Sequence, residues 1–174
     1  MTPARRAVVI SVSAALLTLT ACGGSDSSGE AETLPDVELI GVGETTVNTS
    51  SWVGEPLVIN FWFSTCIPCA TELVDFAEVD AARGDEVRFV GVNPIDTPES
   101  MVEFAGERGV AYDLFRDEFA ELQEELRVAQ FPATYFVASD GTIVDSTGVL
   151  DTESLNRQID ELLTADGTFQ ETTT

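Results

Sequence analysis

Residues 57–69 read Leu-Val-Ile-Asn-Phe-Trp-Phe-Ser-Thr-Cys-Ile-Pro-Cys, and the character of the chain changes in the middle of this stretch. Its first seven residues are almost all apolar, with β-branched and aromatic members, which is typical of a central strand buried on both faces. Two cysteines follow, separated by two residues, and Pro68 between them fits the first turn of a helix. The stretch therefore predicts a buried strand that leads directly into a helix beginning near Cys66.

Helices and further strands are predicted on both sides of this stretch. Upstream, residues 36–39 and 46–47 resemble two short strands joined by a glycine-containing turn. Downstream, the first helix runs to Gly84, and Thr97-Pro98 supplies the N-cap and first position of a second helix that closes at Gly109. The remaining predicted elements are a strand at 87–92, a short helix at 117–126, a strand at 133–138, an Asp140-Gly141 hairpin turn, a strand at 142–145 and a helix at 151–163.

Apolar residues at helical spacing indicate which helix faces are buried. The expected buried residues are Leu73, Phe76, Ala77 and Val79 in the first helix, Met101, Val102, Phe104 and Ala105 in the second, Phe119, Leu122 and Leu126 in the short helix, and Leu155, Ile159, Leu162 and Leu163 in the last. The order of elements predicts an α/β fold with a mixed central β-sheet flanked by helices and an N-terminal β-hairpin. One domain over residues 34–165 accommodates it, followed by a polar C-terminal tail at 166–174.

Residues 1–21 are expected to be a signal peptide and not part of the fold. Two arginines precede a weakly polar to apolar run from Ala7 to Leu19, which is too short for a comfortable membrane span. The following Leu19-Thr20-Ala21-Cys22 resembles the lipobox of bacterial lipoproteins, in which the cysteine is lipidated and becomes the first mature residue. An ordinary signal peptide followed by an incidental cysteine is the alternative. Residues 22–33, rich in glycine and serine, have the composition of a flexible tether.

The composition excludes several classes of function. Acidic residues number 31 against 8 basic ones, for a formal net charge of −23, and the basic residues are all arginines. Such a surface repels nucleic acid and anionic lipid headgroups. The chain contains no histidine, which excludes His-based acid–base catalysis and most zinc, copper and haem sites. We therefore expect no metal, no cofactor other than a redox-active cysteine pair, and no nucleic-acid partner.

The three cysteines fall into a single residue, Cys22, and a closely spaced pair, Cys66 and Cys69. If Cys22 carries the lipid, Cys66 and Cys69 remain as a pair whose spacing is typical of a redox or metal site. Disulfide exchange needs a thiolate, and the unpaired N–H groups and the dipole at a helix N-terminus lower a thiol pKa toward neutrality. Cys66 lies at the predicted helix start and Cys69 one turn inside. Cys66 is therefore predicted to attack, and Cys69 to resolve the mixed disulfide.

These residues resemble a known group of proteins. Their motifs are similar to those of the thioredoxin superfamily, and more narrowly of the TlpA/ResA/DsbE group of extracytoplasmic redox and cytochrome c maturation proteins. The residues that carry the resemblance are Asn60-Phe61-Trp62, Cys66-Ile67-Pro68-Cys69, Glu72, Val90-Gly91-Val92-Asn93 and Phe131-Pro132-Ala133-Thr134. The resemblance extends over roughly residues 34–163, nearly the whole predicted domain, and it implies a thioredoxin-like fold.

The resemblance also implies a substrate site. Pro132 matches the family's cis-proline beside the active disulfide, where Phe131 offers backbone groups to a bound peptide and the proline excludes metal from the thiols. A trans proline at a strand start is the alternative. Ile67 and Pro68 are expected to contact the substrate as well. Trp62 is a further candidate for substrate contact, and a core position fits it equally.

The expected proton acceptor differs from that of the best-known members. Those proteins carry a buried aspartate on the central strand, which helps move protons to the resolving thiol. Asn60 occupies this position and cannot titrate. Glu72, three residues after Cys69, matches an acidic residue of the ResA-like branch and lies on the Cys69 side of the helix. If Glu72 is buried, its pKa rises and it can act as a general base; if it is exposed, it is an ordinary first-turn acid.

We therefore expect a monomeric, extracytoplasmic, lipid-anchored thiol–disulfide oxidoreductase, working in either the reducing or the oxidising direction. Its expected partners are cysteine-containing secreted proteins or apocytochromes, and a membrane thiol–disulfide electron carrier. Two alternatives use the same fold. A copper delivery protein would use Cys66 and Cys69 as ligands, but the chain offers no histidine and only Met1 and Met101 as thioethers. A thiol peroxidase would need a threonine and an arginine around its reactive cysteine.

Overall fold

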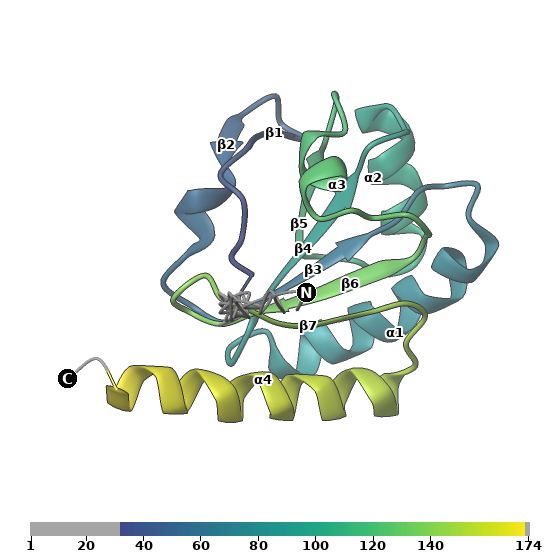
Figure 1. Ribbon diagram of the computed structural model, residues 1–174. Helices are drawn as coiled ribbons and strands as arrows, with labels where there is room; N and C mark the ends of the chain where they lie inside the picture. The colour runs from purple at the N-terminus through teal and green to yellow at the C-terminus, as the bar shows by residue number, and fades with distance from the viewer. Residues whose placement is uncertain (1–31, 173–174) are drawn as a thin grey trace, which may run out of the picture. The chain divides into compact units, whose positions relative to one another are not determined.

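A seven-stranded mixed sheet forms the centre of the structure, in the order β2-β1-β5-β4-β3-β6-β7 (Figure 1). The computed structural model describes residues 32–172, with side chains described through residue 167. The predicted signal peptide, Cys22 and nearly all of the predicted tether therefore lie outside the described residues. The strands are β1 (Glu38–Gly41), β2 (Thr46–Asn48), β3 (Leu57–Phe61), β4 (Arg88–Asn93), β5 (Asp113–Arg116), β6 (Ala133–Val137) and β7 (Ile143–Thr147).

Strand direction brings the ends of several strands to one edge of this sheet. β3, β4 and β5 are parallel, and the ends of β3 and β4 meet where Phe61 pairs with Val92. β6 runs antiparallel to β3 and begins at this edge, where Ala133 pairs with Phe61. β7 ends there too, because Thr147 pairs with Thr134. We call this the cysteine edge, because the loop after β3 carries Cys66.

In the part of the chain that the structure describes, four α-helices and one short 3-10 helix cover the sheet. The helices are η1 (Thr49–Trp52), α1 (Ile67–Arg83), α2 (Pro98–Gly106), α3 (Glu121–Glu125) and α4 (Thr152–Thr172). Side chains alternate across β3, so Val58 packs with α1 and α4 while Ile59 and Phe61 pack with η1 and α3 on the other face. Figure 1 shows α1 and α4 side by side on one face. The predicted two-sided burial of this strand is confirmed.

The helix that carries the cysteines begins and ends where the sequence predicts. Cys66 is the N-cap residue of α1, Pro68 lies in its first turn, and Gly84 caps its C-terminal end. Thr97 caps α2 by accepting a hydrogen bond from the N–H of Ser100, with Pro98 in the first turn. The N-terminal hairpin β1–β2 and the hairpin β6–β7 are confirmed as well. Within residues 32–172, no helix combines the length and apolar character that crossing a membrane requires.

Three features differ from the sequence prediction between α2 and α3. Strand β5 was not predicted, because only two of its four residues are apolar, and pairing with both β4 and β1 defines it. The predicted helix 117–126 shortens to Glu121–Glu125, and Phe119 is exposed on the loop before it. Val102 is also exposed, because Met101 and Ala105 are the residues of α2 that face the core.

The last helix is longer than predicted. The prediction ended it at Leu163, but α4 continues to Thr172. Asp166, inside the expected polar tail, is buried and accepts a hydrogen bond from the backbone N–H of Ser139 at 2.7 Å. This contact ties the end of α4 to the hairpin between β6 and β7. The helix thus extends into the polar sequence after Leu163, where Asp166 has a specific partner in Ser139.

Candidate active site

Cys66 and Cys69 form a disulfide at the N-terminal end of α1, with their Cα atoms 5.3 Å apart. After β3, a turn returns the chain to the sheet edge, in which the N–H of Cys66 donates to the carbonyl of Phe63 at 3.1 Å. The sulfur of Cys66 accepts a hydrogen bond from the N–H of Cys69 at 3.2 Å. That N–H is one of the free donors of the first helical turn, so it favours negative charge on Cys66 when the disulfide opens. The predicted placement of both cysteines is confirmed.

The two sulfurs differ in accessibility. Cys66 is 6% exposed, whereas Cys69 is 0% exposed. Ile67 and Pro68, between them in the sequence, are both exposed. An incoming sulfur therefore reaches Cys66 first, and Cys69 can act only from inside the protein.

Trp62 is buried in the apolar cluster that contains both cysteines. Its side chain is fully buried, stacks on Phe104 with ring centroids 5.7 Å apart, and packs in the same apolar cluster as both cysteines. Of the two alternatives for Trp62, its full burial against Phe104 of α2 supports the core position over substrate contact. Its role is to support the helix start from below.

Glu72 is a buried carboxylate, with only 1% of the residue exposed. Its Oε1 accepts from the N–H of Leu150 at 2.8 Å, and its Oε2 accepts from Nδ2 of Asn60 at 3.0 Å. Burial raises the pKa of Glu72 from 4.5 to about 7, although both hydrogen bonds act in the opposite direction. The carboxyl group therefore exchanges a proton near neutral pH, one helical turn after Cys69. Of the two sequence alternatives for Glu72, the structure shows the buried one, and the role of general base stays a prediction.

Asn60 positions this carboxylate from the central strand. Its Nδ2 donates to Glu72 and also to Oγ1 of Thr134 at 3.1 Å. Thr134 is buried on β6, two residues after Pro132. The Oδ1 atom of Asn60 is buried without a hydrogen-bond partner among the described residues. Asn60 therefore links α1 to β6 and leaves one acceptor free beside Glu72.

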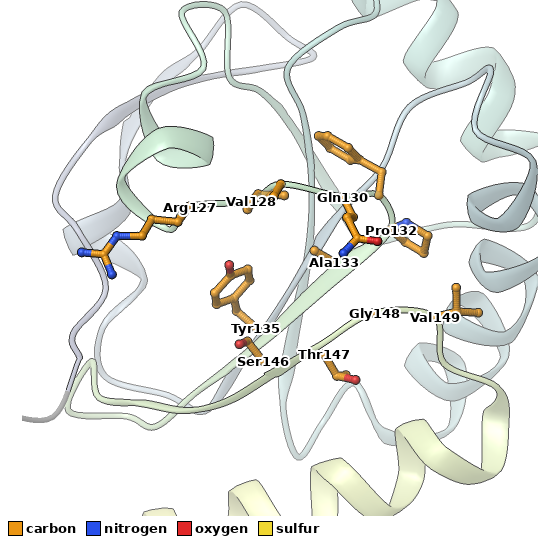
Figure 2. Close-up of a pocket in the computed structure, with 12 residues that line it drawn as sticks. Arg127, Val128, Gln130, Pro132, Ala133, Tyr135, Ser146, Thr147, Gly148 and Val149 are labelled. Atoms are coloured by element: carbon orange, nitrogen blue, oxygen red, sulfur yellow. The ribbon is translucent and has the colours of Figure 1, made fainter.

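A pocket of about 350 Å³ opens beside the cysteine edge, and Pro132 forms part of its wall (Figure 2). The Phe131–Pro132 peptide bond is cis, as the resemblance implies. Phe131 is half-buried and its ring meets Phe63 edge-on, with centroids 5.1 Å apart. The lining residues are Arg127, Val128, Ala129, Gln130, Phe131, Pro132, Ala133, Tyr135, Ser146, Thr147, Gly148 and Val149. Arg127 is the one charged residue among them.

Exposed apolar side chains gather on the loops of the cysteine edge. In the described residues the four most exposed large hydrophobic side chains are Ile67 (84%), Phe119 (77%), Val149 (64%) and Ile95 (58%). They follow β3, β5, β7 and β4 respectively, so topology places all of them at this edge. Isolated exposed hydrophobics are common, but their concentration at one edge indicates a contact surface.

Sequence reasoning did not single out a polar cluster beside Cys66. Ser64 lies after β3, Asn93 ends β4, and Asp96 follows β4. The carboxylate of Asp96 accepts hydrogen bonds from both Ser64 and Asn93. The signal was available, because polar residues at the ends of neighbouring parallel strands meet at one edge. No metal cluster of three or more His, Cys, Asp or Glu side chains occurs within residues 32–172.

Known proteins share this architecture. The profile of the AhpC/TSA family matches residues 31–146. The thiol:disulfide interchange protein HelX of Rhodobacter capsulatus is 32% identical over 112 residues, which cover 63% of this chain and 62% of HelX. This chain spans about three-fifths of the length of the curated relatives it matches.

Two solved structures are similar as well. MTB dsbF, in mixed oxidised and reduced forms, has a TM-score of 0.69 and 26% identity, and the match covers 76% of this chain and 99% of dsbF. The exposed lipoprotein thioredoxin Etrx1 of Streptococcus pneumoniae strain TIGR4 has a TM-score of 0.60 and 25% identity, over 73% of this chain and 99% of Etrx1. The predicted thioredoxin-like fold is confirmed.

Proposed function

The chain belongs to the AhpC/TSA family. We propose that it is an extracytoplasmic thiol–disulfide oxidoreductase acting on protein substrates. One observation carries the proposal: a disulfide at a helix N-terminus in which Cys66 keeps some exposure and Cys69 is fully enclosed. A sulfur pair that serves only to cross-link gains little from a loop of this size. The same pair is suited to exchange, because the outer sulfur is stabilised as a thiolate and the inner one is adjacent.

The reaction transfers two electrons in two steps. In the reducing direction, the Cys66 thiolate attacks a substrate disulfide, forms a Cys66–substrate bond and releases one substrate thiolate. Cys69 then gives its proton to Glu72 and attacks the sulfur of Cys66. The Cys66–Cys69 disulfide forms, and the second substrate thiolate leaves. The substrate thiolates take up protons from Glu72 and solvent, and the oxidising direction reverses each step.

The surface around Cys66 supports a polypeptide as the substrate. Residues 62–68, 128–132 and 147–150 contain no charged side chain, although the chain carries 31 acids. The pocket beside Pro132, in which Arg127 is the one charged lining residue, and the exposed Ile67 provide a partly apolar contact area. Such a surface accepts an extended chain with apolar residues near its cysteine.

The proposed location is outside the cytoplasm, with lipid on Cys22. The lipobox-like Leu19-Thr20-Ala21-Cys22 supports it, and so does the similarity to Etrx1, which is described as an exposed lipoprotein. Apocytochromes or secreted proteins are the proposed substrates, with a membrane thiol–disulfide carrier as electron partner, and the proposed form is a monomer. Fractionation of cells expressing the wild type and Cys22→Ala tests the anchor. Wild-type protein found wholly outside the membrane fraction would contradict it.

Trapping of the mixed disulfide tests the proposed reaction. Insulin reduction is followed with dithiothreitol as the electron donor, and covalent adducts are collected from parallel samples of pre-reduced full chain and oxidised insulin without dithiothreitol. Wild type should accelerate insulin reduction, Cys69→Ser should accumulate an adduct through Cys66, and Cys66→Ser should do neither. In the reduced protein, iodoacetamide at mildly acidic pH should label Cys66 well before Cys69. Equal turnover by Cys66→Ser would contradict the assignment.

The same samples separate the two alternatives on this fold. A thiol peroxidase would consume hydrogen peroxide at rates comparable with disulfide exchange. A copper carrier would bind Cu(I) tightly in the reduced state and lose that binding in Cys66→Ser. We expect neither result, because the buried Cys69 is placed to close a disulfide with Cys66.

A further inference from the structure

The loop that carries Cys66 is tied to the neighbouring strand by a carboxylate. The backbone N–H of Ser64 donates to Oδ2 of Asp96 at 2.6 Å, and Oγ of Ser64 donates to Oδ1 of Asp96 at 2.7 Å. Ser64 follows β3 and Asp96 follows β4, so the contact spans two loops 32 residues apart in the sequence. Hydrogen bonds to a carboxylate are stronger than bonds between neutral groups.

Asp96 is itself held in place. Nδ2 of Asn93 donates to Oδ2 of Asp96 at 2.7 Å, and Oδ1 of Asn93 accepts from the N–H groups of Ile95 and Asp96, both at 2.9 Å. Asn93 is fully buried at the end of β4. The carboxylate therefore has a defined position relative to the sheet, and Ser64 is held to the sheet through it.

Ser64 is the first residue inside the turn that presents Cys66. That turn is closed by the hydrogen bond from the N–H of Cys66 to the carbonyl of Phe63. Cys66 then serves as N-cap of α1, with its sulfur accepting from the N–H of Cys69. Motion at Ser64 moves Cys66 relative to this donor. We propose that Asp96 is a positioning residue for the exchange reaction, holding the Phe63–Cys66 turn so that the Cys66 sulfur stays aligned with the first turn of α1; this inference rests on the proposed function.

The donors around Asp96 allow its charge to be separated from its geometry. In Asp96→Asn, the amide oxygen can replace Oδ2 and accept hydrogen bonds from the N–H of Ser64 and from Nδ2 of Asn93. The amide nitrogen can then donate to the Ser64 hydroxyl, because a hydroxyl oxygen accepts as well as donates. Asp96→Ala removes all three contacts. Ser64→Ala removes only the hydroxyl contact. Glu99→Gln is the matched control, because Glu99 is an exposed acid in the first turn of α2.

The test measures the reaction of Cys66 in the reduced full chain with 5,5′-dithiobis-2-nitrobenzoate across pH 5 to 9. We expect the midpoint of the rate–pH profile to move upward by about one pH unit in Asp96→Ala, because the Cys66 thiolate then loses its aligned N–H donor. The midpoint should move by less than about 0.3 pH unit in Asp96→Asn and by an intermediate amount in Ser64→Ala, and Glu99→Gln should match wild type. With oxidised insulin, and dithiothreitol as the electron donor, kcat should fall in Asp96→Ala while KM changes little.

Several results would overturn the inference. One is a midpoint of the rate–pH profile in folded Asp96→Ala within about 0.3 pH unit of wild type, which would show that Asp96 only stabilises the loop. Another is a midpoint in Asp96→Asn as high as in Asp96→Ala, which would attribute the effect to charge. If Asp96→Ala does not fold, an unchanged midpoint in Ser64→Ala overturns the inference. Failure of the proposed function looks different, because wild-type protein would then not accelerate insulin reduction.

Discussion

At the scale of single residues, Glu72 is the proposed proton acceptor of the site, and Asn60 holds its carboxylate. Burial holds the pKa of Glu72 at about 7, so both protonation states are populated at neutral pH. Asn60 donates to the carboxylate, and its free Oδ1 can accept from a protonated Glu72 if the amide turns over. The acceptor on the helix thus takes the place of an ionisable group on the strand.

Glu72→Gln should slow the second step of the exchange reaction. Cys69 must lose a proton before it attacks, and glutamine cannot take that proton. We expect resolution of the mixed disulfide at pH 7 to slow at least about tenfold, with little change in the attack by Cys66. The deficit should shrink as pH rises, because hydroxide then deprotonates Cys69 directly. Stopped-flow kinetics of both steps test this. Equal resolution rates from pH 6 to 8 would assign Glu72 a structural role.

The same substitution should change how stability depends on pH. The pKa of Glu72 is 4.5 in its reference state and about 7 in the fold, so between these values the native state binds a proton that the unfolded state releases. The free energy of unfolding therefore falls as pH rises through this window, by about 3 kcal/mol in total from this one group. Urea unfolding of oxidised wild type and Glu72→Gln at pH 4 and pH 8 measures the difference. Parallel pH profiles would contradict it.

At the scale of elements, contacts at chain positions far from the cysteines define the site. The N–H of Leu150, in the connection from β7 to α4, holds Glu72 on α1. The same connection carries Val149, which lines the pocket beside Pro132 (Figure 2). The length of α4 contributes at its other end, where Asp166 meets Ser139. The connection into α4 therefore holds the site, and the far end of α4 holds the β6–β7 hairpin.

Truncation after Ala165 should destabilise the fold more than truncation after Gly167. The shorter chain lacks Asp166 and leaves the partly buried N–H of Ser139 without its acceptor. We expect this loss to lower the free energy of unfolding by about 1–3 kcal/mol. The longer one keeps this contact and is the matched control. Urea unfolding of both chains at one pH gives the comparison. Equal stabilities would show that the last turns of α4 add nothing to the fold.

At the scale of the whole molecule, the segments around the reactive cysteine differ in charge from the rest of a strongly acidic protein. The formal net charge is −23, yet residues 62–68 and 128–132, around Cys66 and Pro132, carry no charged side chain. An acidic field attracts cations and repels anions over roughly one Debye length, about 10 Å at 0.1 M salt. We therefore expect the acidic surface to select a substrate by its charge while the substrate approaches, and apolar contacts to bind it once it reaches Cys66.

Exchange with small disulfides should reveal this field. Reduced protein should react faster with cationic cystamine than with anionic dithiodiglycolate, by at least about fivefold at low ionic strength after correction for their intrinsic reactivities. The ratio should approach one at about 0.5 M salt, because screening removes the long-range attraction. Free dithiothreitol, measured with both disulfides, supplies the correction. A ratio independent of salt would show that the acidic surface does not influence the approach.

Local sequence signals predicted much of the fold and the reactive pair. The apolar run of β3, the cap and proline of α1, and the Asp-Gly hairpin each depend on residues only a few positions apart. Together with the resemblance, they placed Cys66, Cys69 and the cis bond at Pro132 correctly. Each of these local signals is contained within a short stretch of the chain.

The tertiary structure decided the features that depend on distant residues. Whether Glu72 is buried, whether Trp62 faces substrate and whether Phe119 joins the core were all open or wrongly predicted from sequence. Glu72 meets Leu150 across 78 positions and Asn60 meets Thr134 across 74, and neither contact leaves a local pattern. Strand β5 exists because two other strands pair with it. Burial and pairing are set by the packing of whole elements, and only the folded chain brings those elements together.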